Sequence, residues 1–255
     1  MSPTDRESWP STPGGYEPAA PARPTRKENV LARAAGAFAF VMGCIPRRKS
    51  GRRALTVLTV LMAFAGVALL SYPVVTDFWA HARQNNLNKQ FASKQMIDLY
   101  RKNEIKIGGA LTRLVIDKMG ACPTCKVNVI VVQGISGNAL RAGAGHYPQT
   151  ALPGDQGNVA IAGHRTGFGE PFRHLDALRP GDLVVLTTPI GKYTYQVLAP
   201  PVDGHANPWI THDKDVSVLY PTIDAELTLT TCDPPHTSKN RLIVRAKLIK
   251  SQIVA

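Results

Sequence analysis

A cysteine ends a segment that reads as a short β-strand, on the face opposite the leucines of that segment. Leu227–Cys232 has the sequence LTLTTC. Successive side chains of a strand point to opposite faces, so Leu227 and Leu229 share the face expected to enter a core, whereas Cys232 points away from it. A cysteine that only packs belongs on the leucine face, so Cys232 is a candidate reactive thiol.

A histidine and an arginine follow the same rule. In the segment 158–164, NVAIAGH, Val159 and Ile161 share one face, and His164 lies on the other face at the end. Arg241 opens the segment RLIVRAKL, in which every second residue from Leu242 onward is apolar. A thiol, an imidazole and a guanidinium at strand ends, all off the core face, would supply nucleophilic thiol catalysis. Taken singly, the three residues also fit an inert cysteine, a solvated histidine and a surface arginine, and the pattern alone leaves that choice open.

The elements that must position these residues are short strands separated by turns. Glycine and proline clusters punctuate the sequence beyond Gly108, for example at 152–155, 179–182 and 233–235. Repeated short strands with such turns predict an all-β barrel or sandwich, with one short helical turn at 172–178. The expected strands are 111–116, 127–132, 159–162, 183–188, 192–197, 227–231 and 242–248.

The chain before Gly108 has a different organisation. The formal net charge is +12, and a basic cluster at residues 47–53 directly precedes the uncharged apolar run Ala54–Val75. About 20 apolar residues cross the hydrocarbon core of a bilayer, and the basic side of such a helix stays in the cytoplasm. We therefore expect a disordered basic cytoplasmic tail at 1–53, a single transmembrane helix at 54–75, a helical or extended linker at 76–107 and an extracytoplasmic catalytic domain at 108–255.

Other interpretations of the tail and the apolar run fit less well. A basic cluster can bind nucleic acid, but the apolar run after it indicates a cell membrane instead, so no nucleic acid is expected as a partner. A cleaved signal peptide has a shorter apolar region, and a buried core helix would lack the flanking arginines. Tyr72 and Trp79 are expected at one membrane interface, and Val30–Ile45 could lie on the inner membrane surface.

Cys122 and Cys125 form a Cys-x-x-Cys motif between two expected strands. The motif lacks the βαβ context of a thioredoxin-like redox site, and no second cysteine pair outside the membrane could complete a zinc site. An oxidising compartment favours a small disulfide in this loop, with two free thiols as the alternative. Cys44, on the cytoplasmic side, is expected to be inert or acylated. No metal or cofactor is expected.

Several separated motifs resemble the sortase family. The sequence TLTTC at 228–232 fits the sortase signature TLxTC, Arg241 follows nine positions after Cys232 as in that family, and His164 ends the strand that bears the family's histidine. The segments GHYPQTALPG, AGHRT, LRPGD and RLIV, which begin at residues 145, 162, 178 and 241, are similar to class E sortases of high-GC Gram-positive bacteria. The resemblance covers about 108–248 and departs at 233–236, DPPH, where that class more often has His-Pro or Asn-Pro after the cysteine.

The resemblance implies an eight-stranded sortase β-barrel with short helices and the activity of a cysteine transpeptidase. Such an enzyme cleaves an LPxTG or LAxTG sorting signal between Thr and Gly, holds the protein as a thioester, and transfers it to an amine of a cell-wall precursor (lipid II) or of a pilin. Cys232 would be the nucleophile, His164 the acid and base, and Arg241 the support for the substrate or the oxyanion. The Thr231 segment would offer a hydrogen-bond donor, and Tyr147 is either a substrate-selecting residue or a packed aromatic.

The residue pattern leaves further functions open beside this one. They are a pilus-polymerising sortase, a non-catalytic anchored β-barrel that binds partners, and an envelope thiol-redox protein that uses Cys122 and Cys125. No acidic third catalytic residue is evident, because Asp233 should point away from its neighbour Cys232. The remaining histidines are expected at the surface or in loops; they include 146, 174, 205, 212 and 236.

Overall fold

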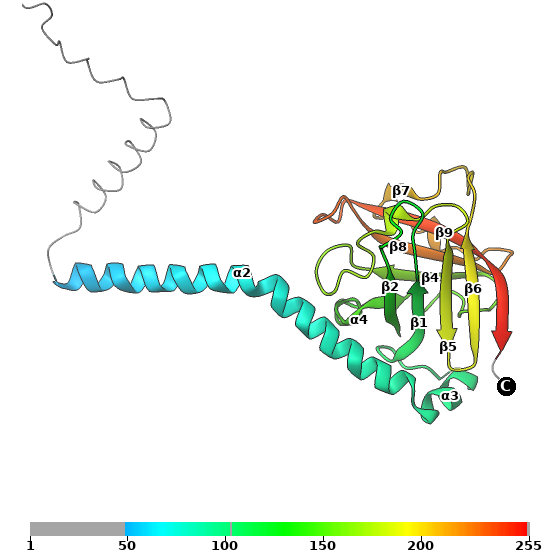
Figure 1. The fold of residues 1–255 in the computed structure, drawn as a ribbon, viewed down its shortest axis with the longest axis horizontal. Helices are drawn as coiled ribbons and strands as arrows, with labels where there is room; N and C mark the ends of the chain where they lie inside the picture. Colours follow the sequence, from blue (N-terminus) through cyan, green and yellow to red (C-terminus); the bar gives the residue numbers. More distant parts are fainter. Residues whose placement is uncertain (1–48, 103, 254–255) are drawn as a thin grey trace, which may run out of the picture. The chain divides into compact units, whose positions relative to one another are not determined.

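The computed structural model describes residues 49–102 and 104–253 of the chain (Figure 1). Two compact units, 1–65 and 66–255, meet within the long helix α2 (Lys49–Phe91). The expected tail falls largely outside the described residues, and the expectations for Cys44 and Val30–Ile45 fall wholly outside them.

Eight strands close into a barrel in the order β1, β2, β3, β4, β8, β9, β6, β5 and back to β1 (Figure 1). The pairs β2–β3 and β4–β8 are parallel, and all other pairs are antiparallel. A further strand, β7, pairs with the first residues of β9. The bounds are β1 Ala110–Ile116, β2 Val127–Gln133, β3 Ala144–His146, β4 Asn158–Gly163, β5 Leu183–Thr188, β6 Gly191–Val197, β7 Trp209–His212, β8 Glu226–Asp233 and β9 Asn240–Ile253.

The barrel interior is filled by the alternate apolar residues that the strand pattern predicts. Val159, Ile161, Leu227 and Leu229 are fully buried there, together with Phe172 from the loop after β4. The seven expected strands are present, each within a few residues of its expected bounds, except that β9 continues to Ile253. The all-β barrel is therefore confirmed, and the short turn expected at 172–178 is the 3-10 helix η1 (Leu175–Ala177).

Four elements were not expected from the sequence: β3, β7, α4 and the 3-10 helix η2 (Ser217–Leu219). Strand β3 has three residues and β7 has four, which is too short for an alternation of apolar and polar residues to show. Helix α4 (Gly137–Ala142) is a single short helix whose N-terminus is capped by the Ser136 side chain, which accepts a hydrogen bond from the backbone N–H of Ala139.

Helix α2 carries the apolar run. Within the described part of the chain, α2 is the one helix that is both long enough and apolar enough to cross a membrane. Its most apolar stretch is not buried in the protein. Large side chains such as Leu58, Phe64, Leu70 and Phe78 are exposed along it. Exposed apolar residues around a whole helix are expected where lipid rather than water surrounds it.

The segment expected as a linker is helical and packs on the barrel. The end of α2 buries Leu87 against β1, β2 and α4. The next helix, α3 (Lys94–Arg101), buries Met96 and Tyr100 against Leu111. Residues 76–101 are thus folded against the barrel in unit 2, rather than a spacer outside it.

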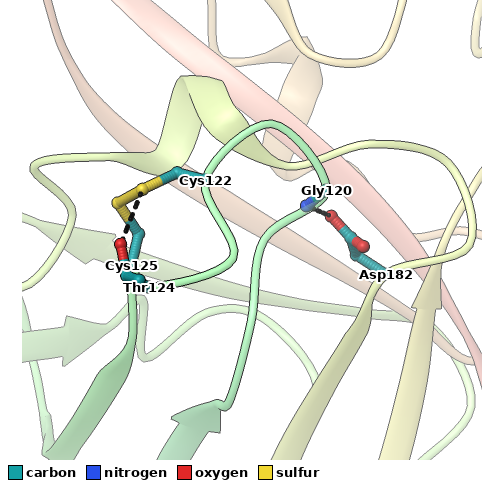
Figure 2. Close-up of a disulfide and its surroundings, with 5 residues drawn as sticks. All are labelled: Gly120, Cys122, Thr124, Cys125 and Asp182. Carbon is teal, nitrogen blue, oxygen red and sulfur yellow. Dashed lines mark hydrogen bonds between the residues drawn. A yellow bond between two sulfur atoms is a disulfide. The ribbon is translucent and has the colours of Figure 1, made fainter.

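Cys122 and Cys125 are joined by a disulfide in the loop between β1 and β2 (Figure 2). The same loop is fastened to the start of β5, because the backbone N–H of Gly120 donates to the Asp182 carboxylate at 2.7 Å. The disulfide lies away from the groove that contains Cys232, and neither of its cysteines lines that groove.

Candidate active site

Cys232, His164 and Arg241 line one groove of about 220 Å³ on the outer face of the barrel. The three residues expected to act together on the basis of strand parity are therefore brought together by the fold. Tyr147 and Thr231, the two expected substrate-binding residues, line the same groove. The remaining lining residues are Ile135, Leu140, Ala162, Gly163 and Thr230.

Strand pairing explains why the three side chains meet. Strands β4 and β8 run in parallel with Ala162 opposite Thr230, so His164 and Cys232 each lie two residues beyond a paired position, at the same edge of the sheet. In the antiparallel pair β8–β9, Cys232 lies directly opposite Arg241. Directly opposite residues project on the same face of a sheet. The histidine, the thiol and the guanidinium therefore come from three adjacent strands and share the outer face.

Cys232 is partly exposed and is the one free cysteine among residues 49–102 and 104–253. The preceding residue, Thr231, is buried, and its hydroxyl donates to the carbonyl oxygen of Gly163 at 2.8 Å. This bond ties the strand end that bears Cys232 to the strand end that bears His164. The Thr231 hydroxyl is thus engaged within the protein, and the whole residue is only 2% exposed.

His164 is half-buried beside an aromatic ring. Its imidazole lies 5.4 Å from the ring of Phe168, centroid to centroid, and the guanidinium carbon of Arg141 lies 5.6 Å from the centroid of the same ring. Burial, and secondarily the positive charge of Arg141, lowers the pKa of His164 from its ordinary value of 6.5. The imidazole is therefore neutral at pH 7 and can accept a proton.

Arg241 donates from Nη1 to two backbone carbonyls of the turn between β8 and β9. The acceptors are the oxygens of Ser238 at 3.0 Å and Asn240 at 2.9 Å. These bonds hold the guanidinium at the edge of the groove, and its other two nitrogens, Nε and Nη2, could donate to a substrate carbonyl or an oxyanion.

An ion pair that the sequence did not suggest joins the two strand tips. Arg165, next to His164, is 7% exposed and pairs with Asp233, next to Cys232. Arg165 also pairs with Asp176 at 3.2 Å and lies 3.5 Å from the carbonyl oxygen of Cys232. Asp233 points away from the groove, as parity predicts, and its role is to hold the tips together. The adjacency of His164–Arg165 and Cys232–Asp233 was the only sign of it in the sequence.

Tyr147, which follows β3, lines the groove. Its hydroxyl lies 3.4 Å from the hydroxyl of Thr230, and the side chain is partly exposed. A partly exposed phenol in the groove is accessible to a substrate, which favours the substrate-selecting interpretation over that of a packed aromatic.

The expectation for His146 was wrong. It was placed at the surface or in a loop, but it ends β3 and is fully buried. Its Nδ1 lies 2.8 Å from Oε1 of Gln133, and its Nε2 lies 2.9 Å from the carbonyl oxygen of Ala151. Burial lowers the pKa of His146 from its ordinary value, against the opposing effect of the Ala151 carbonyl. His174, His205, His212 and His236 are exposed, as expected.

No group of three or more His, Cys, Asp or Glu side chains that could hold a metal ion occurs in the described part of the chain.

Comparisons with known proteins agree with this geometry. The family model described as the sortase domain matches residues 121–249. The chain belongs to the sortase family. Its sequence is 30% identical to sortase SrtE1 of Streptomyces coelicolor over 208 residues, which cover 73% of this chain and 55% of that protein. It is 28% identical to sortase SrtE2 of the same organism, over 82% of this chain and 88% of that protein. The likeness to class E sortases is thus supported, and the chain spans little more than half the length of the first of these relatives.

A solved sortase has the same fold. The sortase D5 transpeptidase of Clostridium perfringens superposes with a TM-score of 0.53 at 27% identity, over 67% of this chain and 98% of that chain. The expected sortase β-barrel is therefore confirmed, and the groove that contains Cys232 lies on it.

Proposed function

We propose that this sortase is a membrane-anchored cysteine transpeptidase. It cleaves a sorting signal of the LPxTG or LAxTG type between Thr and Gly and transfers the protein to an amine of a cell-wall precursor such as lipid II. The observation that carries the proposal is the convergence of Cys232, His164 and Arg241 in one groove of a sortase barrel. The apolar stretch of α2 supports the anchor, with the N-terminus in the cytoplasm and the barrel outside the membrane.

In the first half of the reaction, the thiol proton of Cys232 passes to the neutral imidazole of His164. The resulting thiolate attacks the carbonyl carbon of the substrate Thr, because only the thiolate is strongly nucleophilic. A Sγ–C bond forms and the carbonyl oxygen takes the negative charge. When the C–N bond to Gly breaks, the His164 imidazolium gives its proton to the leaving amine, and a thioester remains.

The lowered pKa of His164 favours the neutral imidazole before the reaction begins. At pH 7 the imidazole is neutral at rest, so it is a base before it is an acid. In the second half, His164 takes a proton from the attacking amine, the new C–N bond forms, and the C–S bond breaks. The same proton returns to the thiolate of Cys232, and the enzyme is regenerated.

Arg241 stabilises the negative charge that develops on the carbonyl oxygen. Arg241 lies opposite Cys232 in the register of β8 and β9. The carbonyl oxygens of Ser238 and Asn240 already hold its Nη1 in place. A donor that is in place before the reaction does not have to reorganise as the charge appears. Replacing Arg241 by Ala should lower kcat by about 100-fold or more, the range found for loss of one oxyanion donor.

The proposal is tested with the purified full chain, an LPxTG or LAxTG peptide and an amine. Mass spectrometry should detect the thioester on Cys232 and then the peptide joined to the amine. Cys232→Ala should give neither species, and His164→Ala should give product at a greatly reduced rate. The Cys122→Ser/Cys125→Ser double variant is the matched control, and it should keep its activity because the disulfide is outside the groove.

The outcome that contradicts the proposal is product formation by Cys232→Ala, or loss of product in the disulfide variant alone. The choice of amine in the same assay separates the two kinds of sortase. Transfer to a cell-wall peptide amine supports the proposed function, whereas transfer only to a pilin lysine would replace it with pilus polymerisation.

A further inference from the structure

The loop that follows His164 is fastened to helix α2. The backbone N–H of Gly169 donates to Oδ1 of Asp77 at 3.0 Å. Gly169 has φ +77, and a Cβ at this position would lie 3.6 Å from the Cβ of Ala80, which is 3% exposed. The loop therefore lies directly on the helical turn that follows the apolar run.

The residue before Gly169 is Phe168, the aromatic neighbour of His164. Phe168 has φ +52, a conformation that residues other than glycine rarely adopt. A bulky residue keeps such a backbone only when its surroundings impose it. The hydrogen bond from Gly169 to Asp77 is one such constraint, and it acts on the peptide next to the ring that contacts His164.

Helix α2 also helps to position Arg141, the second side chain that contacts the Phe168 ring. Gln84 donates to the carbonyl oxygens of Ala142 at 2.6 Å and Ile130 at 3.1 Å, and it accepts from the backbone N–H of Ile130 at 2.8 Å. Ala142 ends α4, the helix that carries Arg141, whose guanidinium lies over the Phe168 ring. The Gln84 side chain thus connects α2 to both α4 and β2.

We propose that residues 76–87 of α2 are part of the active-site structure, with Asp77 and Gln84 as positioning residues. Asp77 holds the loop that places Phe168 against His164, and Gln84 holds the helix that places Arg141 over Phe168. The catalytic domain then begins at about Thr76 and not at Gly108. This inference rests on the proposed function, because it assigns a role in the orientation of His164.

The physical consequence is a coupling between the helix that follows the apolar run and the catalytic imidazole. An imidazole that must take a proton from Cys232 and later deliver it to an amine depends on its orientation. A misplacement of about 1 Å can cost about 100-fold in rate. Loss of the Asp77 contact should free the loop that carries Phe168 and hydrate His164, whereas Gln84 still holds the helix that carries Arg141.

The test compares Asp77→Ala with Asp77→Asn in the full chain in detergent. Asn retains a side-chain oxygen that can accept from Gly169, whereas Ala does not. Asp77→Ala should lower kcat by about tenfold or more, with KM nearly unchanged, and Asp77→Asn should restore most of it. Asp98→Ala is the matched control, since Asp98 is exposed on α3 and its carboxylate bonds to no residue of the barrel in the described part of the chain. Its kcat should equal that of the wild type.

The second readout is the pKa of His164, measured by NMR of histidine-labelled protein and assigned with His164→Ala. In Asp77→Ala this pKa should rise toward its ordinary range, because burial, the main cause of its depression, weakens. Unchanged kcat and pKa in Asp77→Ala would overturn the proposal. So would equal impairment of Asp77→Asn, which would show that the hydrogen-bond acceptor is not what matters.

A variant in the loop keeps the test decisive if Asp77→Ala loses stability. Phe168→Leu removes the ring without touching α2 and should give the same fall in kcat and the same rise in pKa. The Asp77→Ala/Phe168→Leu double variant should be no worse than either single variant, because both act through one contact. Additive effects would contradict the proposal. If the wild type forms no thioester, the proposed function fails, yet the NMR pKa values still decide whether α2 positions His164.

Discussion

Replacing Arg165 by Met should lower both the stability of the barrel and its activity. The guanidinium is buried, and the change leaves Asp233, whose side chain is 16% exposed, without its partner. Breaking a fully buried ion pair costs roughly 3–5 kcal/mol. Asp233 retains some contact with solvent, and Asp176 is 54% exposed, so we expect about 2–3 kcal/mol here. For a domain of this size that is a fall of roughly 4–12 °C in Tm.

The activity should fall because Arg165 contacts both strand tips. It follows His164 in the chain and lies 3.5 Å from the carbonyl oxygen of Cys232. We expect kcat to fall by about tenfold or more, since small displacements of reacting groups are costly. Thermal unfolding and the thioester assay measure the two effects on the same protein.

A double-mutant cycle with Asp233→Asn decides whether the pair is responsible. The Arg165→Met/Asp233→Asn variant leaves only Asp176, which is 54% exposed, without its partner, so it should lose less stability than the two single variants together. If the losses simply add to within about 0.5 kcal/mol, the pair is not coupled and the reasoning is refuted. Lys247→Met is the matched control, because it breaks the exposed pair with Asp224, and its Tm should hardly change.

Three further predictions concern the surroundings of the groove. Arg141→Gln removes a cation near His164, so the NMR pKa of His164 should rise toward its ordinary value; a fall or no change would show that this charge is not felt there. Reduction of the Cys122–Cys125 disulfide should lower stability by roughly 2 kcal/mol or less in urea unfolding, since the closed loop is very short, and activity should persist. Tyr147→Phe removes one hydroxyl from the groove and should change the ratio of kcat/KM for LPxTG and LAxTG peptides by about fivefold, the value of a hydrogen bond of about 1 kcal/mol; an unchanged ratio would return Tyr147 to a packing role.

The sequence predicted the barrel and the face on which the site lies because strand parity is a local property. Leu227 and Leu229 enter the core, and Cys232 lies on the other face, as their spacing requires. His146 shows where local reading fails. A histidine between glycine and tyrosine looks like a loop residue, and its burial depends on hydrogen-bond partners that come from Gln133 and Ala151.

The role of the segment before the barrel was also not predictable from its composition. Residues 76–107 are rich in polar side chains, which is typical of a spacer. Gln84 is one of these polar residues, yet it makes three hydrogen bonds to the backbone of β2 and α4. A polar side chain that binds distant backbone groups has the same appearance in a sequence as one that binds water.

The same argument explains why residue types alone could not decide the chemistry of the site. Parity states which way Cys232, His164 and Arg241 point, but their meeting depends on which strands are neighbours. The parallel pairing of β4 with β8 joins segments about 70 residues apart, and no local pattern specifies it. That pairing is fixed at its end by the hydrogen bond from the Thr231 hydroxyl to Gly163 and by the Arg165–Asp233 pair, and these residues are adjacent in sequence to Cys232 and His164. The residues proposed to carry the chemistry are therefore visible in the sequence through their strand positions, whereas the residues that hold them in place become visible only when the strands are paired.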